Sequence, residues 1–342
     1  MNEINHWRIT LDTNPDYCNL NCVMCEDHSP YAASRLERKQ IGTLRPNMNR
    51  SLLEKVIREA AAMGIKEVIP STMGEPLLYP HFEIFLDLCH ELGLSLNLTT
   101  NGTFPCKEKH QNVEYWAKRI VPIGSDVKIS WNGATEQKQK EIMGTTLNMH
   151  IDNARRFIVV RDKLSDQHYC KMTMQLTFMK SNLNDVPALL ELALELGFDR
   201  LKGHQLWTHF PELEKESLRN DIALAEHWNQ IVKDCKQRVR EHNETAKRPF
   251  KLDNFFEMTL ENLEDIALGG FCPFLGREIW IDPSGRFNVC CAPDQERKKL
   301  GNFGNLNDTS LEVLATSQAY QELMENYRLN PLCQKCNMRR PV

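Results

Sequence analysis

The sequence predicts an α/β protein, in which a partial (β/α)6 open barrel precedes a smaller, cysteine-rich α+β domain. From residue 7 to about 205, six β-rich runs alternate with segments of helical periodicity, a pattern typical of a parallel sheet covered by helices. Six strands are fewer than the eight of a closed (β/α)8 barrel, so we expect the barrel to remain open. After residue 271, a short hairpin, a helix and closely spaced cysteines replace this alternation.

The barrel elements can be placed in chain order. The expected strands are 7–13, 67–71, 95–99, 126–131, 171–178 and 200–204. The clearest helices are 51–63, 82–92, 151–164 and 186–196. Asn49 and Asn184 are expected to be N-caps, and Gly64, Gly93 and Gly197 are expected to end three of the helices.

The remaining chain is expected to form two further regions. The barrel is assigned to residues 1–211, and the polar segment 212–270 is expected to be a solvated helical bridge. Residues 271–342 form the third region, with a hairpin in 277–291 around a Pro-Ser-Gly turn and a final helix over 310–327.

Composition narrows the class of protein. The chain has 342 residues, a net charge of −4 and 12 cysteines. A chain of this length buries an adequate core without disulfide bonds, so the cysteines indicate metal or redox chemistry in a reducing compartment. Its opening residues do not show the basic-then-apolar pattern expected of a signal peptide, and the sequence has no run of about 18 apolar residues and no basic surplus. We therefore expect a cytoplasmic protein that binds neither nucleic acid nor membranes.

Three cysteines near the N-terminus form a C-x3-C-x2-C motif: Cys18, Cys22 and Cys25. Three closely spaced thiolates suit an iron–sulfur cubane, in which one of the four irons keeps an open position for a ligand. The alternative is a zinc loop that His28 completes, because a structural zinc ion needs four ligands.

Polar residues and glycines gather where the expected strands end, which is where (β/α) barrels place their chemistry. Glu75, beside Gly74, offers a carboxylate to an ammonium group, and Asn101, Ser130 and Asn132 offer short polar groups to a ribose or a carboxylate. His204 ends the sixth strand and is either a base or substrate contact or a structural histidine.

Over roughly residues 5–205, these features together resemble the radical S-adenosylmethionine (SAM) superfamily. The resemblance implies that Cys18, Cys22 and Cys25 bind a [4Fe-4S] cluster whose open iron chelates SAM. It also implies that the motif Gly74-Glu75-Pro76 holds the amino group of SAM.

Two positions depart from the common pattern of that superfamily. The segment 130–133 is similar to its SxDG strand end, with Asn132 in place of the acid. Met24 occupies the position beside the adenine where many members carry an aromatic ring. By resemblance, Met24, Ser130 and Asn132 are expected in the SAM site, and Asn101 is expected there from its place at a strand end.

The C-terminal region resembles the SPASM/Twitch extension, in its shorter Twitch form. The resemblance implies one auxiliary [4Fe-4S] cluster bound by Cys272, Cys290, Cys333 and Cys336, and a zinc ribbon on the same thiolates is the alternative. Cys291 is left over from this count. It is either a hydrogen-atom donor, a substitute ligand or an ordinary buried thiol.

The resemblance implies reductive cleavage of SAM to a 5′-deoxyadenosyl radical, with an electron donor such as flavodoxin or ferredoxin. An auxiliary cluster favours a two-electron oxidation of the substrate, hence an oxidoreductase. The first expected strand starts near Trp7 and leaves no room for a leader-peptide-binding domain, which favours dehydrogenation of a small molecule. The alternatives are a peptide maturase that forms crosslinks or epimers, and a non-catalytic zinc-binding interaction protein.

Overall fold

The structure is a computed structural model that describes residues 5–71, 73–106, 108, 110–261, 263, 270–292, 294–334, 336 and 338–339. The chain divides into two compact units. Unit 1 comprises Met1–Tyr17, Thr43–Leu98 and Ile266–Val342, and unit 2 comprises Cys18–Gly42 and Thr99–Asp265. Strand β3 (Ser95–Thr100) passes from one unit to the other.

Unit 1 contains the N-terminal strands and the C-terminal hairpin. Its strands are β1 (Arg8–Leu11), β2 (Glu67–Ile69), the start of β3, β8 (Glu278–Ile281) and β9 (Phe287–Asn288), in the order β3-β2-β1-β8-β9. The expected hairpin is present, with β9 antiparallel to β8. Its first strand also pairs in parallel with β1, in the register Arg8↔Glu278, so the hairpin extends the parallel sheet.

Unit 1 contains nine helices among its described residues, and the predicted capping residues bound two of them, α2 and α3. They are α2 (Arg50–Ala62), η1 (Pro76–Leu78), α3 (Phe82–Glu91), α9 (Asp294–Arg297), η5 (Lys298–Leu300), α10 (Leu311–Ala315), α11 (Gln318–Asn326), η6 (Tyr327–Leu329) and α12 (Pro331–Gln334). Asn49 caps α2 by accepting from Leu52 N at 2.8 Å, and Gly64 and Gly93 follow α2 and α3 with positive φ. The predicted helix 310–327 is broken, because Ser317 caps a second helix, α11.

Unit 2 carries the remaining parallel strands. These are β4 (Gly124–Ser130), β5 (Lys171–Phe178), β6 (Arg200–Gln205) and β7 (Lys251–Asp253), in the order β7-β6-β5-β4. Its helices are α1 (Ala33–Gln40), α4 (Val113–Ile120), η2 (Val121–Ile123), α5 (Glu136–Met143), α6 (Leu147–Leu164), η3 (Lys180–Asp185), α7 (Val186–Leu196), η4 (Pro211–Glu216) and α8 (Ile222–Thr245). Strand β7 was not predicted.

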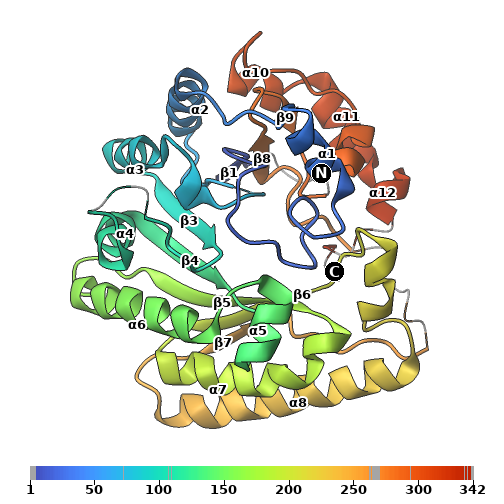
Figure 1. Ribbon diagram of the computed structural model, residues 1–342. Helices are drawn as coiled ribbons and strands as arrows, with labels where there is room; N and C mark the ends of the chain where they lie inside the picture. The colour runs from blue at the N-terminus through green and yellow to red at the C-terminus, as the bar shows by residue number, and fades with distance from the viewer. Residues whose placement is uncertain are drawn as a thin grey trace. The chain divides into compact units, whose positions relative to one another are not determined.

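Two expectations for unit 2 are corrected. Asn184 does not cap α7: it lies in η3 and pairs with His227 Nε2 at 2.7 Å, while Gly197 ends α7 in the left-handed conformation as predicted. The segment expected to be a solvated bridge contains α8, which buries one face. The buried α8 residues are Ala225, Trp228, Asn229, Ile231, Val232, Cys235 and Val239. Helices α6, α7 and α8 lie along the same side of the strands (Figure 1).

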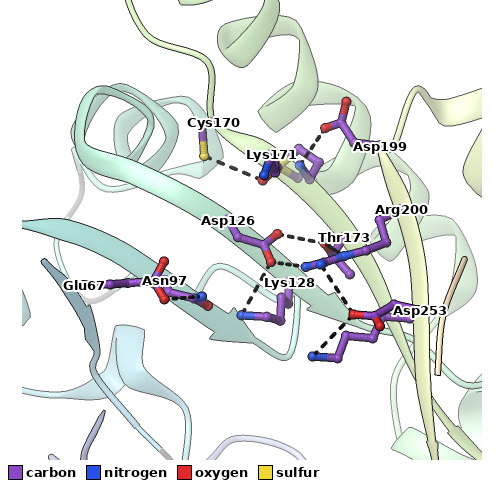
Figure 2. Close-up of polar contacts among 12 residues, drawn as sticks. Glu67, Asn97, Asp126, Lys128, Cys170, Lys171, Thr173, Asp199, Arg200 and Asp253 are labelled. Atoms are coloured by element: carbon purple, nitrogen blue, oxygen red, sulfur yellow. Dashed lines mark hydrogen bonds and ion pairs between the residues drawn. The ribbon is translucent and has the colours of Figure 1, made fainter. Parts of the chain in front are cut away.

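The two faces of the unit 2 strands differ in chemistry. Phe178 packs on Trp228 of α8, with ring centroids 4.4 Å apart, so this face of β5 meets the helices. Successive strand residues point in opposite directions, so Thr173, Gln175 and Thr177 of β5 share the opposite face, which is polar. Arg200 there bonds Thr173 Oγ1 at 3.0 Å and pairs with Asp126 and Asp253 (Figure 2). Polar side chains therefore face away from the helical layer.

The helices of the described ranges include none that is long and apolar enough to cross a membrane.

Candidate SAM and iron–sulfur sites

The N-terminal cysteine motif lies at the start of unit 2, in a loop without regular secondary structure. Cys18 Sγ accepts a hydrogen bond from Leu20 N at 3.5 Å, and Cys25 Sγ accepts from His28 N at 3.4 Å. Cys22 Sγ lies 3.8 Å from the Met143 carbonyl oxygen, to which its thiol donates. Each sulfur therefore has a backbone partner.

Apolar packing fixes the same loop against the helices of unit 2. Val23 N donates to Ile142 O at 2.9 Å at the end of α5. Leu20 is buried with Ile142 and Met143, and Met24 is half-buried against this cluster. Met24 therefore lies one residue from Cys25 in an apolar setting, which suits its predicted position beside the adenine.

Asn101 follows β3 and is only 8% exposed. Its Nδ2 donates to Cys18 Sγ at 3.6 Å and to Asn19 Oδ1 at 2.8 Å. Its Oδ1 accepts from the backbone N and the hydroxyl of Thr103, at 3.0 and 2.7 Å. The structure thus brings Asn101 to a predicted cluster ligand, whereas its contact with SAM stays a prediction.

The remaining predicted residues of unit 2 lie at the ends of β4 and β6. Ser130 is the half-buried last residue of β4. Asn132 is buried, and its Oδ1 accepts from Thr177 N at 2.8 Å, so it ties the end of β4 to β5. His204 Nε2 lies 3.5 Å from Thr177 Oγ1. Burial lowers the pKa of His204 to about 4, with Lys202 acting in the same direction, so this imidazole is neutral at neutral pH.

The Gly74-Glu75-Pro76 motif lies in unit 1 and is built around a close backbone approach. Gly74 has φ +76°, and a Cβ there would lie 2.8 Å from Tyr17 O and still closer to Asn14 O. Glu75 N donates to Tyr17 O at 2.8 Å, and Asn14 Nδ2 donates to Glu75 O at 2.7 Å. The motif therefore packs against, and hydrogen-bonds to, the residues that immediately precede Cys18 in the sequence.

The Glu75 side chain has a defined local role. It is 1% exposed, and its Oε1 accepts from Leu77 N at 3.2 Å, which caps η1. Pro76 is the first residue of that turn, where its missing N–H costs no hydrogen bond. The cap fixes the direction of the carboxylate, and its predicted contact with the SAM ammonium group stays a prediction.

The four predicted auxiliary ligands all lie in unit 1. Cys272 precedes β8, Cys290 follows β9, Cys333 lies in α12 and Cys336 follows it. Burial raises the pKa of Cys272 to about 11, and Cys290 and Cys336 act in the same direction. Burial also raises the pKa of Cys333 to about 12, and the other three thiols contribute. The four thiols are therefore close enough to interact electrostatically.

Cys291 interacts with the adjacent thiol of Cys290. A hydrogen bond with the Cys291 thiol lowers the pKa of Cys290, and the same bond raises the pKa of Cys291. Cys291 thus donates to the sulfur of its neighbour. Its predicted role as a hydrogen-atom donor to a substrate stays a prediction.

The donor chemistry of both cysteine sets fits iron–sulfur clusters. Among the described residues, no group of three or more His, Cys, Asp or Glu is placed so that it could hold a metal ion. Cys18 and Cys25 of the first set accept N–H hydrogen bonds, and so do three sulfurs of the auxiliary set. In the auxiliary set, Leu275 N donates to Cys272 Sγ, Ala292 N to Cys290 Sγ and Met338 N to Cys336 Sγ, at 3.5, 3.3 and 3.4 Å. Such bonds stabilise thiolates and tune cluster potentials.

Several residues that support the two predicted sites were not identified from the sequence. Asn19, Thr103 and His150 support Asn101, and only the position of Asn19 inside the first cysteine motif gave a signal. Arg297 is buried and pairs with Asp12 Oδ2 at 2.6 Å in unit 1. It also helps to lower the pKa of Cys290.

Comparison with known sequences gives matches at both ends of the chain. The family described as the radical SAM superfamily matches residues 15–160, and the family described as an iron–sulfur cluster-binding domain (SPASM) matches residues 272–337. PqqA peptide cyclase of Methylobacterium nodulans is 23% identical over 319 residues, which cover 92% of this chain and 76% of that protein. Probable GTP 3′,8-cyclase of Methanosarcina acetivorans is 24% identical over 278 residues, or 80% and 75% of the two chains.

Solved structures share the fold. Streptococcus suis SuiB bound to its precursor peptide SuiA superposes with a TM-score of 0.65 and 16% identity, over 98% of this chain and 70% of that one. Native anSMEcpe with bound SAM gives 0.65 and 15%, over 96% and 88%. The predicted fold class, an α/β partial barrel with a C-terminal domain, is confirmed.

The radical SAM match includes the first cysteine set and the Gly74-Glu75-Pro76 motif, and the SPASM match includes the C-terminal cysteine set. SAM, its [4Fe-4S] cluster and an auxiliary iron–sulfur cluster are accordingly the cofactors. The chain carries a radical SAM domain over residues 15–160 and a SPASM domain over residues 272–337.

Proposed function

We propose that this radical SAM enzyme modifies a peptide, by forming a crosslink or an epimer. The observation that carries the proposal is the similarity to PqqA peptide cyclase, which extends over 92% of the chain. The sequence-based preference for dehydrogenation of a small molecule has less support than this alternative. The likeness to a GTP cyclase keeps a small-molecule substrate as the second candidate.

The two cysteine sets would hold clusters with different roles. Cys18, Cys22 and Cys25 would hold the cluster that binds SAM, with Glu75 accepting from the SAM amino group. When bound, the cluster and SAM supply a 5′-deoxyadenosyl radical that takes a hydrogen atom from the substrate. Cys272, Cys290, Cys333 and Cys336 would hold the cluster that accepts the electron left on an oxidised substrate. The electron that cleaves SAM would come from a donor such as flavodoxin or ferredoxin.

An aromatic group in unit 2 supports recognition of peptide side chains. Phe210, in the loop after β6, packs on Tyr31 with ring centroids 6.2 Å apart, and His209 packs on Phe210 at 6.2 Å. Trp207 and His209 are stacked at 6.4 Å, and Tyr31 is 39% exposed. Half-exposed aromatic rings bind side chains with little loss of conformational entropy.

His204 is a substrate contact in this proposal. It lies on the polar face of β6, two residues from Lys202. A base with a pKa of about 4 accepts protons weakly at neutral pH. Hydrogen bonding to the substrate therefore suits His204 better than general-base catalysis.

The test is anaerobic turnover of the reconstituted enzyme with SAM, dithionite and the peptide encoded by the short reading frame nearest its gene. We expect 5′-deoxyadenosine, together with a peptide that has either lost two hydrogens or gained a D-residue, measured by mass spectrometry and chiral amino-acid analysis. The Cys22→Ala variant should give neither product. Absence of 5′-deoxyadenosine with every reductant would refute the radical chemistry. Its formation with unmodified peptide, alongside oxidation of a small alcohol, would favour the second candidate.

A further inference from the structure

A closed ring of hydrogen bonds lies beside Cys18 in unit 2. Asn101 Nδ2 donates to Asn19 Oδ1 at 2.8 Å, and Asn19 Nδ2 donates to Thr103 Oγ1 at 2.9 Å. The Thr103 hydroxyl then donates back to Asn101 Oδ1 at 2.7 Å. The three side chains therefore fix one another in one direction around the ring.

The ring determines which end of the Asn101 amide faces Cys18. Thr103 N is a donor only, and it bonds Asn101 Oδ1 at 3.0 Å. The opposite end must therefore be the NH2 group, and its second hydrogen points at Cys18 Sγ, 3.6 Å away. The sulfur receives a donor rather than an acceptor.

Helix α6 holds the backbone of the same loop from its other side. His150, which is fully buried, bonds Asn101 O at 2.7 Å through Nε2, and Asn153 Nδ2 donates to Gly102 O at 2.9 Å. Gly102 has φ +76°, and a Cβ there would lie 2.7 Å from Ile129 Cγ2. The loop cannot shift toward or away from Cys18 without breaking these contacts.

We propose that Asn101 is a positioning residue for the SAM-binding cluster, which orients the Cys18 thiolate and sets the reduction potential of the cluster through an N–H···S hydrogen bond. This inference rests on the proposed ligation of that cluster by Cys18. A donor to a ligating sulfur stabilises the more negative, reduced cluster, so it raises the reduction potential. The role differs from the ribose contact expected from the sequence.

The test is an anaerobic, EPR-monitored redox titration of the holoenzyme, followed on the cluster whose signal changes when SAM is added. Asn101→Asp keeps an acceptor for a ribose hydroxyl but removes the donor to sulfur. We expect the ratio of reduced to oxidised cluster at a fixed potential to fall about tenfold, which is about 59 mV for a one-electron couple. The Kd for SAM should change less than about threefold, that is by less than 1 kcal/mol.

The matched control is Asn19→Asp, which adds the same charge to the same ring without facing the sulfur. We expect it to shift the ratio by less than about threefold, since its charge is exposed and screened. Equal shifts in both variants would show that charge alone acts and would overturn the proposal. An unchanged potential with a tenfold weaker Kd for SAM would make Asn101 a SAM ligand and would overturn it too.

Two further variants keep the outcome decisive. If Asn101→Asp does not fold, Asn101→Ala removes the donor to sulfur without adding a charge, and a shift of the same sign is expected. An unchanged potential in Asn101→Ala would then contradict the proposal. Iron content tests cluster ligation by Cys18 separately from the role of Asn101. Loss of about four irons in Cys18→Ala supports ligation whatever Asn101 does, and full iron in Cys18→Ala would refute ligation itself.

Discussion

Gly74 shows how one side-chain position controls the geometry of a cofactor loop. Its positive φ and the absence of a Cβ let the Glu75 loop approach the backbone of Asn14 and Tyr17. Any other residue would meet two carbonyl oxygens there. The predicted SAM contact of Glu75 depends on that approach, because the same loop directs its carboxylate.

We expect Gly74→Ala to destabilise the protein by about 3 kcal/mol or more, from backbone strain and steric overlap together. The matched control is Gly64→Ala, where φ is +81° but nothing lies within 4 Å of the added methyl. Strain alone should cost about 1 kcal/mol there. The loss of thermal midpoint in Gly74→Ala should be at least twice that in Gly64→Ala. Equal losses would contradict the close approach.

Single residues differ in how far the sequence predicts them. The spacing of Cys18, Cys22 and Cys25 predicted a metal loop, because close thiols have few other uses in a reducing compartment. The bond from Asn101 to Cys18 could not be predicted, since it depends on how the loop after β3 meets a loop more than 80 residues earlier. Proximity of that kind is a property of the fold.

Helix α11 is fixed to the rest of unit 1 through Tyr320. The Tyr320 hydroxyl accepts from Gly276 N at 2.8 Å, which leaves its proton for His6 Nε2 at 3.1 Å. His6 and Tyr320 are also stacked, with ring centroids 5.6 Å apart. The contact therefore joins the segment before β1 to the helix that precedes the last two cysteines.

Burial lowers the pKa of His6 to about 4, so His6 is neutral in the folded protein at pH values where it is charged in the unfolded chain. The unfolded state takes up the proton first, near pH 6.5, so stability is full above that pH and falls as the pH drops toward 4. Between pH 7 and 5.5 we expect a loss of about 1 kcal/mol. His6→Gln, which does not titrate, should lose less thermal midpoint over this interval. Parallel curves for the two proteins would contradict a buried neutral His6.

Strands and helices with strong patterns were predicted, and those without were missed. The six strands of the βα alternation are all present. Strand β7 was missed because its three residues, Lys-Leu-Asp, include one apolar residue and no β-branched or aromatic one. The parallel pairing of β8 with β1 was missed because it joins segments about 270 residues apart. The break between α10 and α11 depends on Ser317, whose capping role competes with helix continuation.

For the chain as a whole, the sequence predicted two cysteine sets with different cofactor roles, and the family matches fall on both. It placed dehydrogenation of a small molecule ahead of the peptide modification that the comparisons support better, because substrate recognition rests on loops. The aromatic group around Phe210 comes from two such loops, one after the cysteine motif and one after β6. Neither loop carries a periodic pattern.

The most direct test of the two-cluster account is the iron and sulfide content of anaerobically purified protein. We predict about eight irons for the native chain and about four for the Cys18/Cys22/Cys25→Ala variant. The complementary variant of Cys272, Cys290, Cys333 and Cys336 should also hold about four, so each set is assigned separately. Four irons in the native protein, unchanged in the N-terminal variant, would contradict the assignment of the first motif. Zinc in place of iron would contradict both.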